Sequence, residues 1–154
     1  MTEQLSPLAL QALAVVEESG AIINANHAHP HTIRHKGRID LVTETDIAVE
    51  AFLKERLATL APHAGFLAEE SAEDLSLPDT CWIIDPVDGT TNFAHGLPLT
   101  VTSVAYRLNG EIVLGIVNAP LLRECFIAEK GKGAWRNGER ISVSSVTACE
   151  NALV

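Results

Sequence analysis

Two aspartates three residues apart end an apolar run in the segment WIIDPVDGTTNF, residues 82–93. Mg²⁺ prefers oxygen ligands in near-octahedral geometry. A strand that ends in Asp85-Pro86-Val87-Asp88 offers three such ligands, the two carboxylates and the Val87 carbonyl. Proline favours an extended conformation for the residue before it, so the Asp85 carboxylate continues the strand direction. The spacing therefore predicts a divalent-cation site at a strand end.

Gly89 and Thr90 follow the second aspartate directly. Glycine lets the backbone approach a ligand closely. If a helix begins near Thr90, its free amides and the positive end of its dipole face an anion such as phosphate. We expect a phosphate-binding turn beside the cation site.

A second pair of acids, Glu69 and Glu70, ends the short apolar segment GFLAE. Taken alone, adjacent acids at a strand end are typical of a solvated turn. Taken with DPVDGTT they favour a two-metal site, in which ions about 3.5–4 Å apart hold the attacking and leaving oxygens of a phosphoryl transfer. We therefore expect both strand ends to contribute to one site.

Asp46 lies in the segment TETD, where a helix is expected to begin. Most acids in a first helical turn only complement the helix dipole. An acid close to a catalytic water can also take its proton, directly or through a hydroxyl such as that of Thr90. The sequence leaves both roles open for Asp46.

The first element that the sequence predicts is an amphipathic helix from Ser6-Pro7 to about residue 25. Serine caps helix N-termini, and proline suits the first helical position. The polar stretch 24–38 is expected to be a loop, and we expect its alternating histidines to solvate it rather than bind a metal. These histidines are His27, His29, His31 and His35.

A second helix is expected after DLVTETD, with Thr43 or Thr45 as its cap and Pro62 near its end. Acids populate its first turn, where they interact favourably with the helix dipole. Its apolar stripe consists of Val49, Phe52, Leu53, Leu57 and Leu60.

Strands are expected over GFLAE, CWIID, LTVTSVAYRL, EIVLGIVNA and residues 123–128. The dipeptides Asn109-Gly110 and Asn137-Gly138 are β-hairpin signals. The apolar end of the chain, residues 152–154, is typical of a further strand that is just beginning. Helices in the first third and antiparallel strands in the last third predict the α+β class.

Composition narrows the class of protein. The 154 residues are one domain's worth of chain, with an ordinary apolar fraction of 47%. The net charge is −9, and twelve of the twenty acids lie between Asp40 and Asp88, which disfavours binding to a nucleic-acid backbone.

No apolar run approaches the roughly 20 residues of a membrane span, and the N-terminus lacks a signal-peptide pattern. Three cysteines without metal-ligand spacing suit a reducing compartment, so we expect a cytoplasmic protein.

Three blocks, DLVTETD, AEES and WIIDPVDGTTNFAHGLP, resemble in order and spacing those of the inositol monophosphatase family of Mg²⁺-dependent, lithium-sensitive phosphatases. The segments GIVNAP and KGKGAWRNGERISVS extend the likeness, which runs from the first helix to Val154. The resemblance implies the layered αβαβα fold shared with fructose bisphosphatases. Residues 1–154 resemble its N-terminal part, an α+β metal-binding domain with two helices on a mainly antiparallel sheet.

The resemblance also implies a set of metal ligands. Glu69, Asp85 and the Val87 carbonyl would hold a first Mg²⁺ ion. Asp85, as a bridge, and Asp88 would hold a second. Two or three ions per site are implied for the complete enzyme.

Catalytic and substrate-binding roles follow from the same resemblance. Glu69 and Thr90 would activate the attacking water, with Asp46 behind Thr90. The amides of Gly89 and Thr90 would bind the phosphate. The substrate-binding set that the resemblance implies is Glu69, Val87, Asp88, Gly89 and Thr90. Lys36 also lies in a family-like position, but no role is assigned to it.

Two departures from the family pattern matter. AEES stands where GEES is common, a mild change because alanine is also small. Nothing in the sequence matches the C-terminal block of the type W-D-x-A-A-G, whose aspartate is a further metal ligand in the family. We therefore expect an N-terminal portion without the C-terminal domain, with weak Mg²⁺ affinity and little turnover by itself.

The function implied is hydrolysis of inositol 1-phosphate or a similar polyol or sugar phosphate by a homodimeric enzyme. Related phosphatases of fructose bisphosphate, histidinol phosphate or phosphonucleotides stay open, as does an inactive chain that acts as an interaction module. The haloacid dehalogenase type is disfavoured, because its D-x-D-G-T motif separates the two aspartates by two residues rather than three. Trapping an aspartyl-phosphate at Asp85 would overturn this choice.

Overall fold

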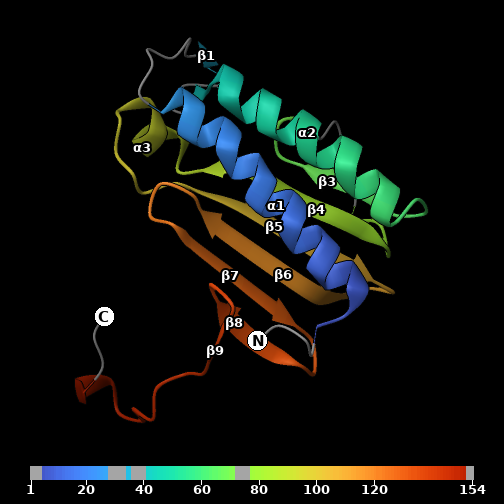
Figure 1. The fold of residues 1–154 in the computed structure, drawn as a ribbon, viewed down its shortest axis with the longest axis vertical. Helices are drawn as coiled ribbons and strands as arrows, with labels where there is room; N and C mark the ends of the chain where they lie inside the picture. Colours follow the sequence, from blue (N-terminus) through green and yellow to red (C-terminus); the bar gives the residue numbers. More distant parts are fainter. Residues whose placement is uncertain (1–4, 28–33, 36–40, 72–76, 152–154) are drawn as a thin grey trace.

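The computed structural model describes residues 5–27, 34–35, 41–71 and 77–151. Helices α1 (Pro7–Asn26) and α2 (Glu44–Leu60) lie side by side across one face of a β-sheet, and the short helix α3 (Thr90–Ala94) lies at one end of the layer (Figure 1). Two helices on a sheet are the arrangement that the sequence predicts.

The sheet has seven strands within the described residues, and their order in space follows the chain. β3 and β4 are parallel, and every other neighbouring pair is antiparallel. The expectation of a mainly antiparallel sheet is confirmed. The strands are β3 (Gly65–Ala68), β4 (Cys81–Asp88), β5 (Val101–Leu108), β6 (Glu111–Ala119), β7 (Glu124–Glu129), β8 (Gly133–Arg136) and β9 (Glu139–Ile141).

Local capping chemistry sets where the long helices begin. The Ser6 hydroxyl accepts a hydrogen bond from the Ala9 amide at 3.2 Å, which satisfies one of the free amides of α1. In α2 the structure selects Thr43 as the cap: its side chain accepts from the Thr45 amide, while Asp46 reaches back to the Thr43 amide. This reciprocal pair is a capping box.

The apolar stripes of both helices face the sheet. Along α1 the buried positions include Ala9, Ala12, Val16 and Ile23. Along α2, Val49, Leu53 and Leu57 are buried, whereas Phe52 and Leu60 are partly buried. On the sheet side, Trp82 and Tyr106 pack with ring centroids 4.5 Å apart. Burial of these side chains is the main source of stability that holds the two layers together.

Helix α1 corrects one expectation. It is 20 residues long with a mean hydropathy of 1.3, which is long and apolar enough to cross a membrane by length and composition alone. This length and hydropathy contradict the expectation that no apolar run approaches a membrane span. In the structure the helix packs against α2 and β6 and buries seven residues, as core helices do.

Two turns form where asparagine precedes glycine. Asn109 and Gly110 have φ of 52° and 84° and connect β5 to β6. Asn137 and Gly138, with φ of 49° and 81°, connect β8 to β9. Positive φ at both central residues suits the right-handed twist of paired strands. Both hairpin predictions are confirmed.

Strand β4 is longer than the sequence predicts. It runs on from CWIID to Asp88, with a shift of register against β5 between Asp85 and Asp88. The irregularity includes Pro86, which has no amide to donate to a ladder. The bounds expected from CWIID alone are therefore three residues too short, whereas the strand that ends in Asp85-Pro86-Val87-Asp88 is confirmed and both aspartates belong to it.

The polar stretch 24–38 is also partly structured. Residues 24–26 belong to α1, and β1 (Arg34–His35) pairs with β2 (Leu41–Val42), which corrects the expectation of a loop throughout. The predictions for His29, His31 and Lys36 lie outside the described residues. A 3-10 turn covers Cys149–Asn151, and the strand expected after it also lies outside them.

Candidate active site at the ends of β3 and β4

Parallel pairing brings the two acidic strand ends together. Ala68 lies opposite Ile84, and the Glu69 amide donates to the Ile84 carbonyl at 3.1 Å. Glu69 therefore continues β3 beside Asp85 on β4. Sequence reasoning expected both ends in one site, and the pairing gives the physical reason: carboxyl ends of parallel strands meet at one edge of a sheet.

Asp85 is the most perturbed acid of this edge. Its side chain is partly buried, and its Oδ1 has no hydrogen-bond partner among the described residues. Burial raises the pKa of Asp85 to about 7, and the nearby Glu69 carboxylate adds to the increase. Asp88 and Asp46 raise the same pKa further by repulsion between like charges. The edge is therefore a cluster of carboxylates at which a cation would be stabilised.

Asp46 is buried and joins α2 to the end of β4. Its Oδ2 accepts from the Thr43 amide at 2.9 Å and from the Thr43 hydroxyl at 2.5 Å. Its Oδ1 accepts from the Thr90 hydroxyl at 3.1 Å. Asp46 thus stands behind Thr90, as the resemblance implies, and it also has the capping role that the sequence left open.

The Thr90 hydroxyl has two acceptors within reach, Asp46 and the Val87 carbonyl, which lies 2.9 Å away. A hydroxyl has a single proton, so it donates to one of them at a time. When it donates to Asp46, the Val87 carbonyl keeps its lone pairs for another partner. The lone pairs of Thr90 itself then remain able to accept a hydrogen bond from a neighbouring water.

Gly89 provides the tight turn between β4 and α3. Its φ is 90°, and a side-chain carbon at this position would lie 2.8 Å from the Leu99 carbonyl oxygen. Helix α3 begins at Thr90, as expected. Only glycine combines this left-handed backbone with so close an approach of another chain segment.

Gly89→Ala is expected to lower the free energy of unfolding by about 2–4 kcal/mol, because strain at positive φ is added to a steric clash. Gly96→Ala is the matched control. Gly96 also has positive φ, 72°, but an added carbon there meets nothing within 4 Å. We expect it to cost only about 1 kcal/mol, from backbone strain alone. Urea unfolding of both variants measures the difference, and equal losses would show that the Leu99 contact is relieved.

Two threonines that the sequence analysis missed support the irregular part of β4. The Thr102 hydroxyl donates to the Pro86 carbonyl and the Thr100 hydroxyl to the Asp88 carbonyl, each at 2.9 Å. Both threonines are buried. They satisfy the carbonyls on either side of Val87, where the register of the β-ladder is shifted. The alternation T-V-T after Leu99 is the signal that points to one face of a strand.

Glu69 and Asp88 are exposed, whereas Val87 is buried. Within the part of the chain that the structure describes, no three His, Cys, Asp or Glu side chains are arranged to hold one metal ion. The structure therefore pairs Glu69 with Asp85 and Asp46 with Thr90, but it does not gather a full ligand set. The ligand assignments stay predictions.

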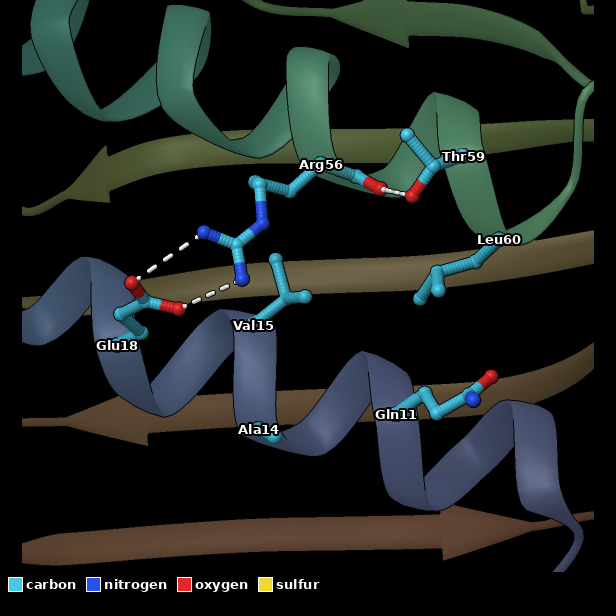
Figure 2. A pocket seen from close by; sticks show the side chains of 7 residues that line it. All are labelled: Gln11, Ala14, Val15, Glu18, Arg56, Thr59 and Leu60. Carbon is cyan, nitrogen blue, oxygen red and sulfur yellow. Dashed lines mark hydrogen bonds and ion pairs between the residues drawn. The ribbon is translucent and has the colours of Figure 1, made fainter.

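Two of the hollows on the described surface differ in how they lie relative to the site. One, of about 300 Å³, adjoins the site and is lined by residues such as Asp88, Gly89 and Leu99. The other, of about 260 Å³, lies between α1 and α2 (Figure 2). There Arg56 and Glu18 form an ion pair at 3.0 Å, so the charges of this groove neutralise each other. Of these two hollows, the first adjoins the candidate catalytic residues and the second does not.

Comparison with known proteins shows the family to which this chain belongs. The model of the inositol monophosphatase family matches residues 4–154. The inositol monophosphatase of Dictyostelium discoideum is 46% identical over 147 residues, which cover 93% of this chain and 54% of that protein.

Solved structures also superpose on this chain. An inositol monophosphatase (IMPase) from Thermotoga maritima superposes with a TM-score of 0.80 at 38% identity, over 86% of this chain and 52% of that one. An IMPase/NADP phosphatase complexed with Mg²⁺ and phosphate superposes with a TM-score of 0.73 at 27% identity, over 82% and 49%. The chain spans about half the length of each of these proteins. By its sequence and by its fold, the chain belongs to the inositol monophosphatase family.

Proposed function

We propose that this chain carries the cation- and phosphate-binding part of the active site of a Mg²⁺-dependent phosphomonoesterase. The observation that carries the proposal is the environment of Asp85. Its buried Oδ1 has no hydrogen-bond partner among the described residues, and its neighbours on the sheet edge are other carboxylates. A divalent cation would give Asp85 Oδ1 a partner and would reduce the repulsion between Asp85 and the neighbouring carboxylates.

The residues present fit Mg²⁺. Carboxylates and a backbone carbonyl are hard oxygen ligands, the class that Mg²⁺ selects. Glu69, Asp85, Asp88 and the Val87 carbonyl would hold it. A structural neighbour binds Mg²⁺ together with phosphate. When bound, the cation neutralises phosphate charge and lowers the pKa of water. The number of ions is proposed from the resemblance alone.

The chain's own groups would move the proton. Glu69 and Thr90 would orient the attacking water and accept its proton. Because Thr90 donates to the buried Asp46 at 3.1 Å, its proton can pass to Asp46 as the hydroxyl takes one from the water. Gly89 and Thr90 would present their amides to the phosphate at the start of α3. The water oxygen would form a new bond to phosphorus as the ester P–O bond breaks, and the leaving oxygen would take a proton from solvent and depart as the alcohol.

A binding experiment tests the proposal on the chain as it exists. Inorganic phosphate is titrated by calorimetry in the presence of Mg²⁺ and in the presence of EDTA. We expect phosphate to bind only with Mg²⁺, because the anionic edge repels phosphate when it lacks a cation. Phosphate binding that is equal in EDTA would overturn the proposal.

The substrate we propose is inositol 1-phosphate or a similar polyol or sugar phosphate. Fructose bisphosphate, histidinol phosphate and phosphonucleotides are further arms of a hydrolysis assay with and without Li⁺. Lithium sensitivity, cytoplasmic location, a homodimer and the absence of nucleic-acid and membrane partners stay predictions. A chain that binds Mg²⁺ and phosphate but hydrolyses none of these compounds would favour the role of an interaction module.

A further inference from the structure

Glu50 is a buried carboxylate for which the proposed mechanism has no use. It lies on α2 one turn after Asp46 and is 4% exposed. Its Oε2 accepts a hydrogen bond of 2.7 Å from the backbone amide of Glu70, twenty residues away in the chain. The bond ties helix α2 to the segment that directly follows β3.

Lys54 adds a second tie one turn further along α2. Its Nζ lies 4.0 Å from Glu50 Oε1 and donates to the Ser71 hydroxyl at 2.8 Å. It also lies 5.9 Å from the centre of the Phe66 ring. Residues four apart lie on one face of a helix. Asp46, Glu50 and Lys54 therefore form a row on one face of α2, and each residue is bound to a different partner.

The row has a consequence for Glu69. The amide of Glu69 is bound to the Ile84 carbonyl at 3.1 Å, and the next amide along the chain is bound to Glu50. Both peptide groups around Glu69 are thus fixed, the first by β4 and the second by α2. Asp46, on the same face of α2, holds the Thr90 hydroxyl at the start of α3.

We propose that Glu50 is a positioning residue of this site, which acts through the Glu70 amide to set where the Glu69 carboxylate lies relative to Asp85. The inference rests on the proposed function. A buried carboxylate is costly unless hydrogen bonds compensate it, and the Glu70 amide and Lys54 provide that compensation. This role depends on the length of the Glu50 side chain, which must reach the Glu70 amide, and not on the negative charge of Glu50.

Three variants separate reach from charge in the 154-residue chain. Glu50→Gln keeps an oxygen at the same distance but loses the charge. Glu50→Asp keeps the charge but shortens the side chain by one carbon. Glu55→Gln is the matched control, because Glu55 is an exposed acid on the same helix. Mn²⁺ is the probe, and its free concentration is followed by electron paramagnetic resonance.

We expect Glu50→Asp to weaken Mn²⁺ binding by about tenfold or more, as loss of a partner behind a metal ligand does, and Glu50→Gln to weaken it by less than about threefold. Glu55→Gln should match the original chain. Hydrogen exchange of the Glu70 amide is the second readout: it should become faster in the Asp variant and stay protected in the Gln variant. If Glu50 only stabilised the fold, Mn²⁺ affinity and exchange of the Glu70 amide would not rank the Asp and Gln variants in this order.

The outcomes separate the inference from the proposed function. If Asp85→Asn loses Mn²⁺ binding while Glu50→Asp binds as tightly as the original chain, the positioning role is wrong and the metal site stands. A Gln variant as weak as the Asp variant would show that charge, not reach, matters, and would also overturn the inference. If Asp85→Asn binds Mn²⁺ unchanged, or the original chain binds none, the metal assignment fails and the inference fails with it.

Discussion

Asp85→Asn is expected to abolish Mg²⁺-dependent phosphate binding and, at the same time, to stabilise the metal-free chain above neutral pH. The first effect follows because an amide offers a single neutral oxygen where the site needs a charged carboxylate. The second follows because the pKa of Asp85 is raised to about 7, by burial first and by Glu69 next. Ionised Asp85 is therefore a cost to the metal-free fold, and asparagine removes that cost.

The pH dependence has a definite sign. The pKa of Asp85 is raised from 3.8 to about 7, so the folded chain holds a proton between these values that the unfolded chain has lost. The free energy of unfolding consequently falls as pH rises through this window and is lowest above it. Solvent screening at the partly exposed side chain limits the difference to about 1–2 kcal/mol. The asparagine variant should lack this component of the pH profile.

Urea unfolding in EDTA, at a pH near 5 and again near 8, measures the effect. The matched control is Asp79→Asn, because Asp79 is an exposed acid whose side chain is 90% accessible and which pairs with Arg107 at 3.7 Å. That control should give no gain near pH 8 and no loss of Mg²⁺-dependent phosphate binding. An asparagine variant at position 85 that still binds phosphate through Mg²⁺ would contradict the ligand assignment.

Features set by neighbouring residues could be predicted from the sequence. Ser6 and Thr43 cap their helices because a hydroxyl reaches amides two or three residues ahead. The turns at 109–110 and 137–138 form because asparagine and glycine tolerate positive φ. The sequence predicted that the acids after β3 and at the end of β4 share one site, but not that the two strands are parallel.

Features set by distant residues could not be predicted. The extension of β4 depends on Thr100 and Thr102, which satisfy its carbonyls from 12 and 16 residues away. Glu50 acts on an amide twenty residues along the chain, and nothing in its local pattern distinguishes it from a solvated helix acid. Motif resemblance located Asp46 behind Thr90, 44 residues apart, which spacing alone does not show.

Asp46→Ala is expected to lower the free energy of unfolding by about 2–4 kcal/mol, from a lost helix cap and from buried hydrogen bonds to a carboxylate. It removes the acceptor of both Thr43 hydrogen bonds and of the Thr90 hydroxyl. The Thr90 hydroxyl then has only the Val87 carbonyl as a protein acceptor in the described site. We therefore expect Mg²⁺-dependent phosphate binding to weaken as well, because that carbonyl is a proposed ligand.

Thr43→Ala separates the two roles of Asp46. It removes the Thr43 hydroxyl from the capping box but leaves the contact between Asp46 and Thr90 in place. Urea unfolding should show a loss of about 1–2 kcal/mol, in the range for a lost cap. Calorimetry with phosphate and Mg²⁺ should show unchanged binding. If both variants weaken phosphate binding equally at matched stability, Asp46 acts only as a helix cap; if only Asp46→Ala weakens it, the carboxylate also serves the site through Thr90.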